Sequence, residues 1–169
     1  MSQSVTLNLA PGQYMLLCII AGADGVPHLA KGMVAPLTVI PAEKAVAAAA
    51  PKADGQVHLV DFSFTLPQAI KAGKQTWEIK NDGKQPHEMT LIKLAEGKTM
   101  ADVAAFMAKP AGAPPFADVG GMQGIMPGAT AWLDLNLEPG NYVALCHIPD
   151  MASGEEHMHL GMIMPFSVE

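Results

Sequence analysis

The sequence has few charged residues, and those it has are mostly acidic. Lys and Arg number 10 against 16 Asp and Glu, which gives a formal net charge of −6. Proteins that bind nucleic acid carry clustered basic residues, and no Lys/Arg cluster occurs here. No apolar run approaches the length of about 20 residues needed to cross a bilayer. The first residues (MSQSV) lack the charged and apolar parts of a signal peptide. The sequence therefore predicts no nucleic-acid partner, no membrane span and no visible export signal.

Aromatic residues are also scarce, at 5% of the chain, whereas 14 prolines and 16 glycines interrupt it. This composition favours short strands joined by many turns over long helices. The length of 169 residues allows one full domain plus a remnant, or two small domains.

Cysteine is rare too, but each of the two cysteines ends the first part of a repeated segment. Residues 11–18 read PGQYMLLC and residues 139–146 read PGNYVALC, and the repeat continues through His28, Gly32, Met33 and Pro36, then His157, Gly161, Met162 and Pro165. Equivalent residues usually serve their own copies, which argues against a disulfide between the two cysteines. A thiolate, an imidazole and a thioether gathered at one point suit copper and not magnesium or calcium.

The repeat also predicts the domain organisation. With the cysteines aligned, residues 1–40 match 129–169 with one insertion, so residues 1–40 are interpreted as the C-terminal fragment of a domain. Residues 41–55, rich in Ala, Pro and Lys, are a predicted linker, and residues 56–169 are a complete domain. The fragment could extend the complete domain's sheet, be completed by another chain, or belong to a longer two-domain protein. We favour the last alternative.

Alternating and apolar segments predict six strands at residues 56–64, 75–81, 87–94, 130–137, 141–147 and 161–168. Helical spacing at residues 99–109 predicts one short helix, with Thr99 as its N-cap. Residues 110–128 are predicted to be a Gly/Pro loop. Its Met122 and Met126 are interpreted as a flexible cover or, alternatively, as a soft docking surface or transient Cu(I) site. Short antiparallel strands at this spacing are typical of a sandwich or barrel.

Residues 56–169 resemble the cupredoxins, the family of blue-copper proteins. The resemblance is carried by Phe62, Phe64, Ile70, Ala72-Gly73, Asn81, Pro86-His87, Pro139-Gly140, Tyr142, Cys146, His157, Gly161 and Met162. It implies an all-β, Greek-key β-sandwich with one short helix in an inserted loop. It also implies one copper ion cycling between Cu(I) and Cu(II), with His87, Cys146 and His157 as equatorial ligands and Met162 as weak axial ligand. A periplasmic or secreted location is implied by the resemblance alone.

Residue spacing bears on these ligands independently. His157 competes with His159, but the five-residue step from His28 to Met33 favours His157, which precedes Met162 by the same step. His147 is expected to be a surface residue or to support the site. Position 88 is Glu, where many members of the family carry a bracing Asn. The segment between Cys146 and His157 is longer than in the small plastocyanin-like members.

The sequence is compatible with three functions. The first is single-electron transfer between redox partner proteins by a mononuclear type 1 copper site. The electron is expected to leave through an exposed edge of the loop histidine, which Met158, Leu160 and Ile163 surround. The second is copper storage or delivery, and the third is a metal-free structural module of a larger assembly. The adjacent Cys146 and His147 resemble multicopper oxidases, but the other histidine clusters of those enzymes are absent from the sequence. We therefore expect no enzymatic activity. The sequence does not indicate the oligomeric state.

Overall fold

The computed structural model describes residues 3–41 and 49–169. Contacts divide the chain into a larger unit, Met1–Leu7 with Pro51–Glu169, and a smaller unit, Asn8–Ala50. Each unit is described by itself below. Within the described ranges, no helix has the length and apolar character needed to cross a membrane.

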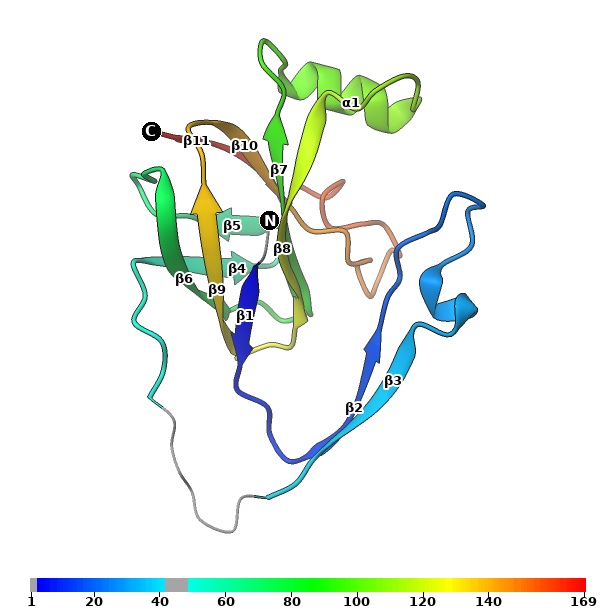
Figure 1. Cartoon of the computed structure of the whole chain (residues 1–169), viewed down its shortest axis with the longest axis vertical. Helices are drawn as coiled ribbons and strands as arrows, with labels where there is room; N and C mark the ends of the chain where they lie inside the picture. The colour runs from blue at the N-terminus through cyan, green and yellow to red at the C-terminus, as the bar shows by residue number, and fades with distance from the viewer. Residues whose placement is uncertain (1–2, 42–48) are drawn as a thin grey trace. The chain divides into compact units, whose positions relative to one another are not determined.

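The larger unit is a β-sandwich (Figure 1). One sheet has the order β1 (Ser4–Leu7), β9 (Thr130–Leu137), β6 (Gly73–Asn81), β4 (Gly55–Val60) and β5 (Ser63–Thr65). The other has the order β11 (Ile163–Val168), β10 (Gly140–Leu145), β7 (His87–Leu94) and β8 (Phe116–Ile125). The β4–β6 pair is parallel, and every other neighbouring pair is antiparallel. The all-β sandwich with one short helix agrees with the sequence prediction.

The core lies between the two sheets and sets the direction of the strand that leads to Cys146. Tyr142 and Ala144 of β10 pack with Cys146 in the main core. The alternate residues, Val143 and Leu145, point to the opposite face of the strand and belong to a second apolar cluster. Because β10 is buried on both faces, its sequence is apolar almost without interruption.

Helix α1 (Met100–Ala108) contributes Val103 to that second cluster. Thr99 is the N-cap of the helix, as predicted, and forms a capping box with Asp102, whose side chain accepts the Thr99 backbone N–H at 2.9 Å. This reciprocal cap satisfies amide groups that the first helical turn leaves without partners.

One strand prediction and one loop prediction were wrong. Residues 56–64 form two strands, β4 and β5, instead of one, because the chain turns at Phe62, whose φ of 64° is left-handed. Residues 116–125 of the predicted loop form β8, which accommodates its glycines in irregular pairing with β7. Gly121 has φ 140°, and a Cβ there would lie 2.0 Å from the carbonyl oxygen of Met89.

The same correction changes the interpretation of the two loop methionines. Met122 lies on β8 with 5% of its surface exposed and packs in the main core. It is therefore not part of a flexible cover or of a docking surface. Met126 follows β8 and is 65% exposed.

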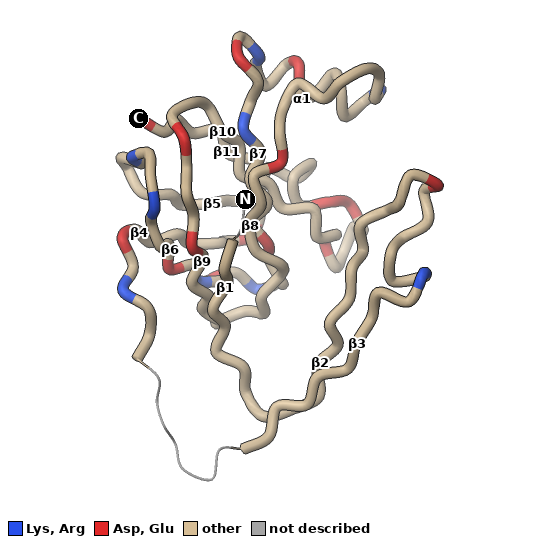
Figure 2. Tube along the Cα trace, in the orientation of Figure 1, with Lys and Arg blue, Asp and Glu red and all other residues tan. Residues whose placement is uncertain are grey.

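The smaller unit is a hairpin of β2 (Gly12–Leu17) and β3 (Val34–Val39), joined through a short 3-10 helix, His28–Lys31. Neither strand carries a charged residue (Figure 2). The sequence groups β1 with this segment, whereas in the structure β1 pairs with β9 of the larger unit. Residues 42–48 of the predicted linker lie outside the described residues, and the interpretation of residues 1–40 as a domain fragment stays a prediction.

Candidate metal centre

Three of the four predicted ligands converge at one end of the sandwich. His87 begins β7, Cys146 directly follows β10, and His157 lies in the segment between β10 and β11. Their candidate donor atoms all lie within 4.8 Å of one another, and none of the three residues is exposed. Antiparallel pairing of β7 with β10 brings the start of one strand to the end of the other, so the Glu88 N–H points at the Cys146 Sγ at 3.5 Å.

Two of the distances among these atoms are close to those expected around a shared ion. The Nδ1 atoms of His87 and His157 are 3.1 Å apart, and Cys146 Sγ is 3.5 Å from His157 Nδ1. Metal–nitrogen bonds of about 2.0 Å and metal–sulfur bonds of about 2.3 Å, at roughly tetrahedral angles, separate such donors by about 3.3–3.6 Å. Two imidazoles and a soft thiolate are a donor set that fits copper.

His87 is oriented by a residue that the sequence analysis missed. Asp61, in the turn between β4 and β5, accepts a hydrogen bond from His87 Nε2 at 2.9 Å. With the proton held on Nε2, the Nδ1 lone pair is free to bind a metal. Burial opposes ionisation of Asp61, but hydrogen bonds from His87 and Lys84 outweigh it, so the pKa of Asp61 lies below its usual value. No spacing pattern marks Asp61, because its turn interrupts what looks like one strand.

Gly83 leaves room for this pair. A Cβ at position 83 would lie 2.5 Å from Asp61 Oδ1 and 2.6 Å from His87 Nε2. The turn that contains Gly83 is held by the buried Asn81, whose side-chain nitrogen donates to the carbonyl oxygens of Gln85 and Ile125 at 2.8 Å. Asn81 Oδ1 in turn accepts the Gly83 N–H at 2.9 Å. The turn that precedes His87 is thereby fixed on both sides.

Glu88 connects the two strands that carry His87 and Cys146. Its Oε1 accepts the backbone N–H of His147 at 2.9 Å. The ring of His147 faces Glu156, with Nδ1 and Oε2 3.2 Å apart. His147 thus follows Cys146 directly and is linked to Glu88 and Glu156, and Glu88 braces the chain after Cys146 against the start of β7. That His147 supports a metal site stays a prediction.

The charge states of the donors follow from burial. Burial raises the pKa of the Cys146 thiol, so the thiol is protonated near neutral pH and must lose its proton when it binds a metal. Burial, and then the proximity of His87, lower the pKa of His157. His157 is therefore held as a neutral imidazole, the form that can act as a ligand.

Backbone hydrogen bonds shape the segment between Cys146 and β11. The Cys146 N–H donates to the Met162 carbonyl at 3.2 Å, and the Met162 N–H donates to the His157 carbonyl at 2.8 Å. Met162 is fully buried and packs in the main core. That its sulfur binds a metal stays a prediction. His159 is exposed, whereas His157 is among the converging residues.

One expectation about His157 was wrong: its ring edge is not exposed. Its Nε2 is buried and has no hydrogen-bond partner among the described residues. The ring of Phe62 lies edge-on to it, with centroids 5.3 Å apart and planes at 74°. Phe62 adopts the left-handed φ that bulky residues rarely accept, and that strained turn places its ring against His157.

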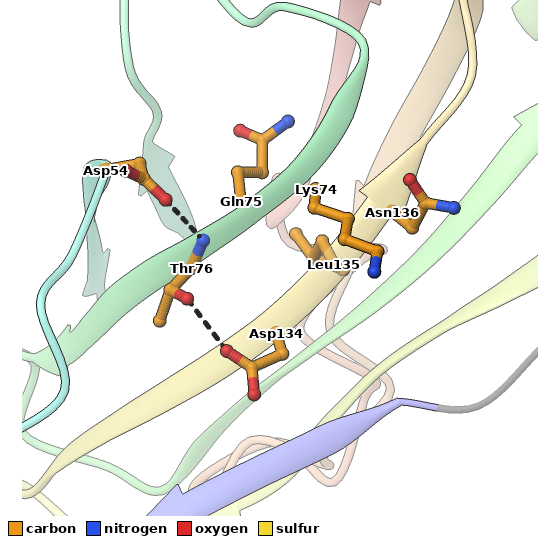
Figure 3. A pocket seen from close by; sticks show the side chains of 7 residues that line it. All are labelled: Asp54, Lys74, Gln75, Thr76, Asp134, Leu135 and Asn136. Carbon is orange, nitrogen blue, oxygen red and sulfur yellow. Dashed lines mark hydrogen bonds between the residues drawn. The ribbon is translucent and has the colours of Figure 1, made fainter.

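A hollow of the larger unit lies on β6 and β9 (Figure 3). Thr76 is at its centre: its N–H donates to Asp54 at 2.9 Å, and its hydroxyl donates to Asp134 at 2.8 Å. Its lining includes no histidine or cysteine. This hollow is therefore separate from the candidate ligands His87, Cys146 and His157.

No family model matches the sequence, and a search of curated proteins gives no match. Among solved structures, the chain is similar to a dithionite-reduced auracyanin from Roseiflexus castenholzii, with 18% identity, 68% of this chain and 94% of that chain covered, and a TM-score of 0.44. It is also similar to auracyanin A, a "blue" copper protein from Chloroflexus aurantiacus, with 17% identity and a TM-score of 0.40; the match covers 68% of this chain and 100% of that chain. A multi-copper oxidase from Pediococcus acidilactici has 14% identity and a TM-score of 0.36; the match covers 79% of this chain and 30% of that chain.

Proposed function

We propose that this protein binds one copper ion in a type 1 site and transfers single electrons between redox partner proteins. His87, Cys146 and His157 are the equatorial ligands, and Met162 is the weak axial ligand. The observation that carries the proposal is the convergence of three unexposed nitrogen and sulfur donors within 4.8 Å. A His₂Cys set with a distant thioether is the donor set of blue-copper sites. The bound ion supplies one-electron exchange between Cu(I) and Cu(II).

The protein's part is to hold the donors still. Asp61 fixes the tautomer of His87 through the 2.9 Å contact with Nε2, and Glu88 ties the chain after Cys146 to the start of β7. Donors oriented before an ion arrives need little rearrangement when its charge changes, and this favours fast electron exchange.

Closure of the site favours electron transfer over copper delivery. A delivery protein must release its ion, but His87, Cys146 and His157 are unexposed, and the ring of Phe62 packs edge-on against His157. The same burial argues against a metal-free structural role. Two imidazoles packed against each other, one with an unpartnered nitrogen, cost more in a core than apolar residues of similar size.

We also propose that the protein is not an oxidase. Among the described residues, His87, Cys146 and His157 form the one group of three or more His, Cys, Asp or Glu residues able to share an ion. Reduction of oxygen to water needs further copper ions near the first. A periplasmic or secreted location is proposed from the sequence resemblance alone.

The test is spectroscopic. Cu(II) added to the full chain is expected to give an intense visible absorption and the narrow EPR splitting of a thiolate-bound type 1 ion. Cys146→Ala should abolish both signals, and Cys18→Ala, the matched control, should retain them. A colourless protein at full copper occupancy would overturn the proposal. A redox titration then separates the functions: reversible one-electron behaviour supports transfer, and an ion locked as Cu(I) supports storage.

A further inference from the structure

The chain around Cys18 repeats the backbone hydrogen bonds found around Cys146. In the smaller unit these bonds are Cys18 N–H to Met33 O at 3.1 Å, Leu29 N–H to Cys18 O at 2.8 Å, His28 N–H to Ile20 O at 2.9 Å and Met33 N–H to His28 O at 3.0 Å. In the larger unit they are Cys146 N–H to Met162 O at 3.2 Å, Met158 N–H to Cys146 O at 2.8 Å, His157 N–H to Ile148 O at 2.9 Å and Met162 N–H to His157 O at 2.8 Å. Gly32 and Gly161, each just before the methionine, both have positive φ, 95° and 117°.

The side-chain donors follow the backbone. Cys18 Sγ lies 3.5 Å from His28 Nδ1, and Cys146 Sγ lies 3.5 Å from His157 Nδ1. The same ring nitrogen faces the sulfur in both copies. The smaller unit therefore presents a thiol and an imidazole in the arrangement used at the candidate metal centre.

A thioether is available on the open side of this pair. Cys18 and Met33 both line one shallow depression of the hairpin, together with residues of β2 and β3. Met33 is 58% exposed, so its side chain can turn toward an ion without disturbing a core. His28 is the one histidine in residues 8–50, so this unit contains no counterpart of His87.

We propose that Cys18, His28 and Met33 form a second metal site, which binds one Cu(I) ion with three ligands. Thiolate and thioether donors select soft Cu(I), which accepts three ligands. Without a second imidazole the site does not provide the His₂Cys set that supports Cu(II) at the first site. Binding replaces the proton of the Cys18 thiol by the metal, and no electron is transferred. The site is open to solvent, so ligands and competing chelators reach it directly.

The experiment counts Cu(I) ions bound by the full chain. Reduced protein is titrated anaerobically with Cu(I) in the presence of a chromophoric Cu(I) chelator. We expect two ions per chain for the wild type and one for Cys18→Ser, His28→Ala or Met33→Leu at chelator concentrations that compete with a three-ligand site. Met15→Leu is the matched control, because Met15 is an exposed methionine of the same hairpin, 56% exposed, that does not line the depression containing Cys18 and Met33. It should retain both ions.

Two further measurements separate this site from the first. Cys146→Ser should lose the first ion and still bind one that depends on Cys18, so failure of the proposed type 1 site leaves this test intact. Cu(I) should also protect Cys18 from alkylation, which mass spectrometry of the peptide detects. An ion count that is the same in the wild type and in Cys18→Ser would overturn the proposal.

Discussion

The two copies of the repeat share a local structure and differ in their surroundings. Both bring a cysteine sulfur to 3.5 Å from a histidine Nδ1. Yet Cys146 and Met162 are fully buried, whereas Cys18 is half-buried and Met33 is 58% exposed. The pairing of sulfur and imidazole is therefore encoded within about 20 residues of hairpin and loop. The second imidazole and the exclusion of water come from strands distant in the sequence.

The strands before the two cysteines show the same division. Val143, Ala144 and Leu145 of β10 are fully buried, between the core on one face and the cluster that includes α1 on the other. Their counterparts in β2, Met15, Leu16 and Leu17, are more than half exposed. The apolar sequence of β2 is thus typical of a strand covered on both faces.

The largest effect is expected from converting the complete copy into the partial one. His87→Ala removes the imidazole that the first copy lacks and leaves Cys146, His157 and Met162. Because Cu(II) in a type 1 site depends on both imidazoles, the intense visible band should be lost, while Cu(I) binding continues. Absorption spectra and the Cu(I) titration check this.

Added imidazole provides the control for His87→Ala. It should enter the vacated space and restore the visible band, because the Asp61 carboxylate remains to receive its N–H. A band of undiminished intensity without imidazole would show that His87 is not a ligand.

The next effect compares core and hairpin through the same substitution. Leu133→Ala in the sandwich, where the side chain is fully buried, should lower the free energy of unfolding by about 2–5 kcal/mol. Leu16→Ala, at a side chain that is 57% exposed, should change it by less than about 0.5 kcal/mol. Denaturant unfolding of the metal-free proteins measures both. A large cost for Leu16→Ala would mean that the hairpin face is covered in the folded protein.

A smaller effect is expected from removing the hydrogen-bond acceptor that orients His87, a residue with no counterpart in the first copy. Asp61→Asn weakens the contact that holds the proton on His87 Nε2, and loss of such a supporting contact lowers metal affinity about 10–100-fold. The control is Asp24→Asn in the smaller unit, where Asp24 bonds Lys31 at 2.6 Å on the surface and does not contact a candidate ligand. Competition titrations with Cu(II) compare the variants. Equal affinities would remove Asp61 from the site.

Sequence reasoning succeeded where the structure is local. The capping box at Thr99 depends on residues three positions apart, and the hairpin ending in Cys146 is marked by its Pro-Gly turn. The repeat favours His157 over His159 through a fixed step from histidine to methionine, and the structure brings His157 to His87 and Cys146. That His157 binds a metal stays a prediction. Each of these signals lies within one short segment.

It failed where a distant contact decides the structure. Phe62 takes a left-handed φ and lies against His157, 95 positions away, so an alternating pattern concealed a turn. The glycines of β8 look like a loop, but Gly121 lies close to the backbone of β7, where no side chain fits. Asp61 was missed for the same reason: only folding brings it to His87.

The smallest effect is the pH dependence of the stability contributed by Asp150, a position at which the two copies differ. Asp150, at the start of the loop that leads to His157, has its pKa lowered to about 2, first by the hydrogen bond from Gln85 and then by those from Ser153. The first copy has Gly22 at the equivalent position.

Because the folded pKa of Asp150 lies below the unfolded value of about 3.9, the stability that Asp150 contributes is complete above pH about 4 and is lost as the pH falls toward about 2. We expect Asp150→Ala to lower the midpoint of thermal unfolding at pH 6. The difference in midpoint between the variant and the wild type should disappear between pH 4 and about 2. Other carboxylates titrate in both proteins and cancel from the difference. A difference for Asp150→Ala that persists unchanged at pH 2 would show that its contribution does not depend on charge.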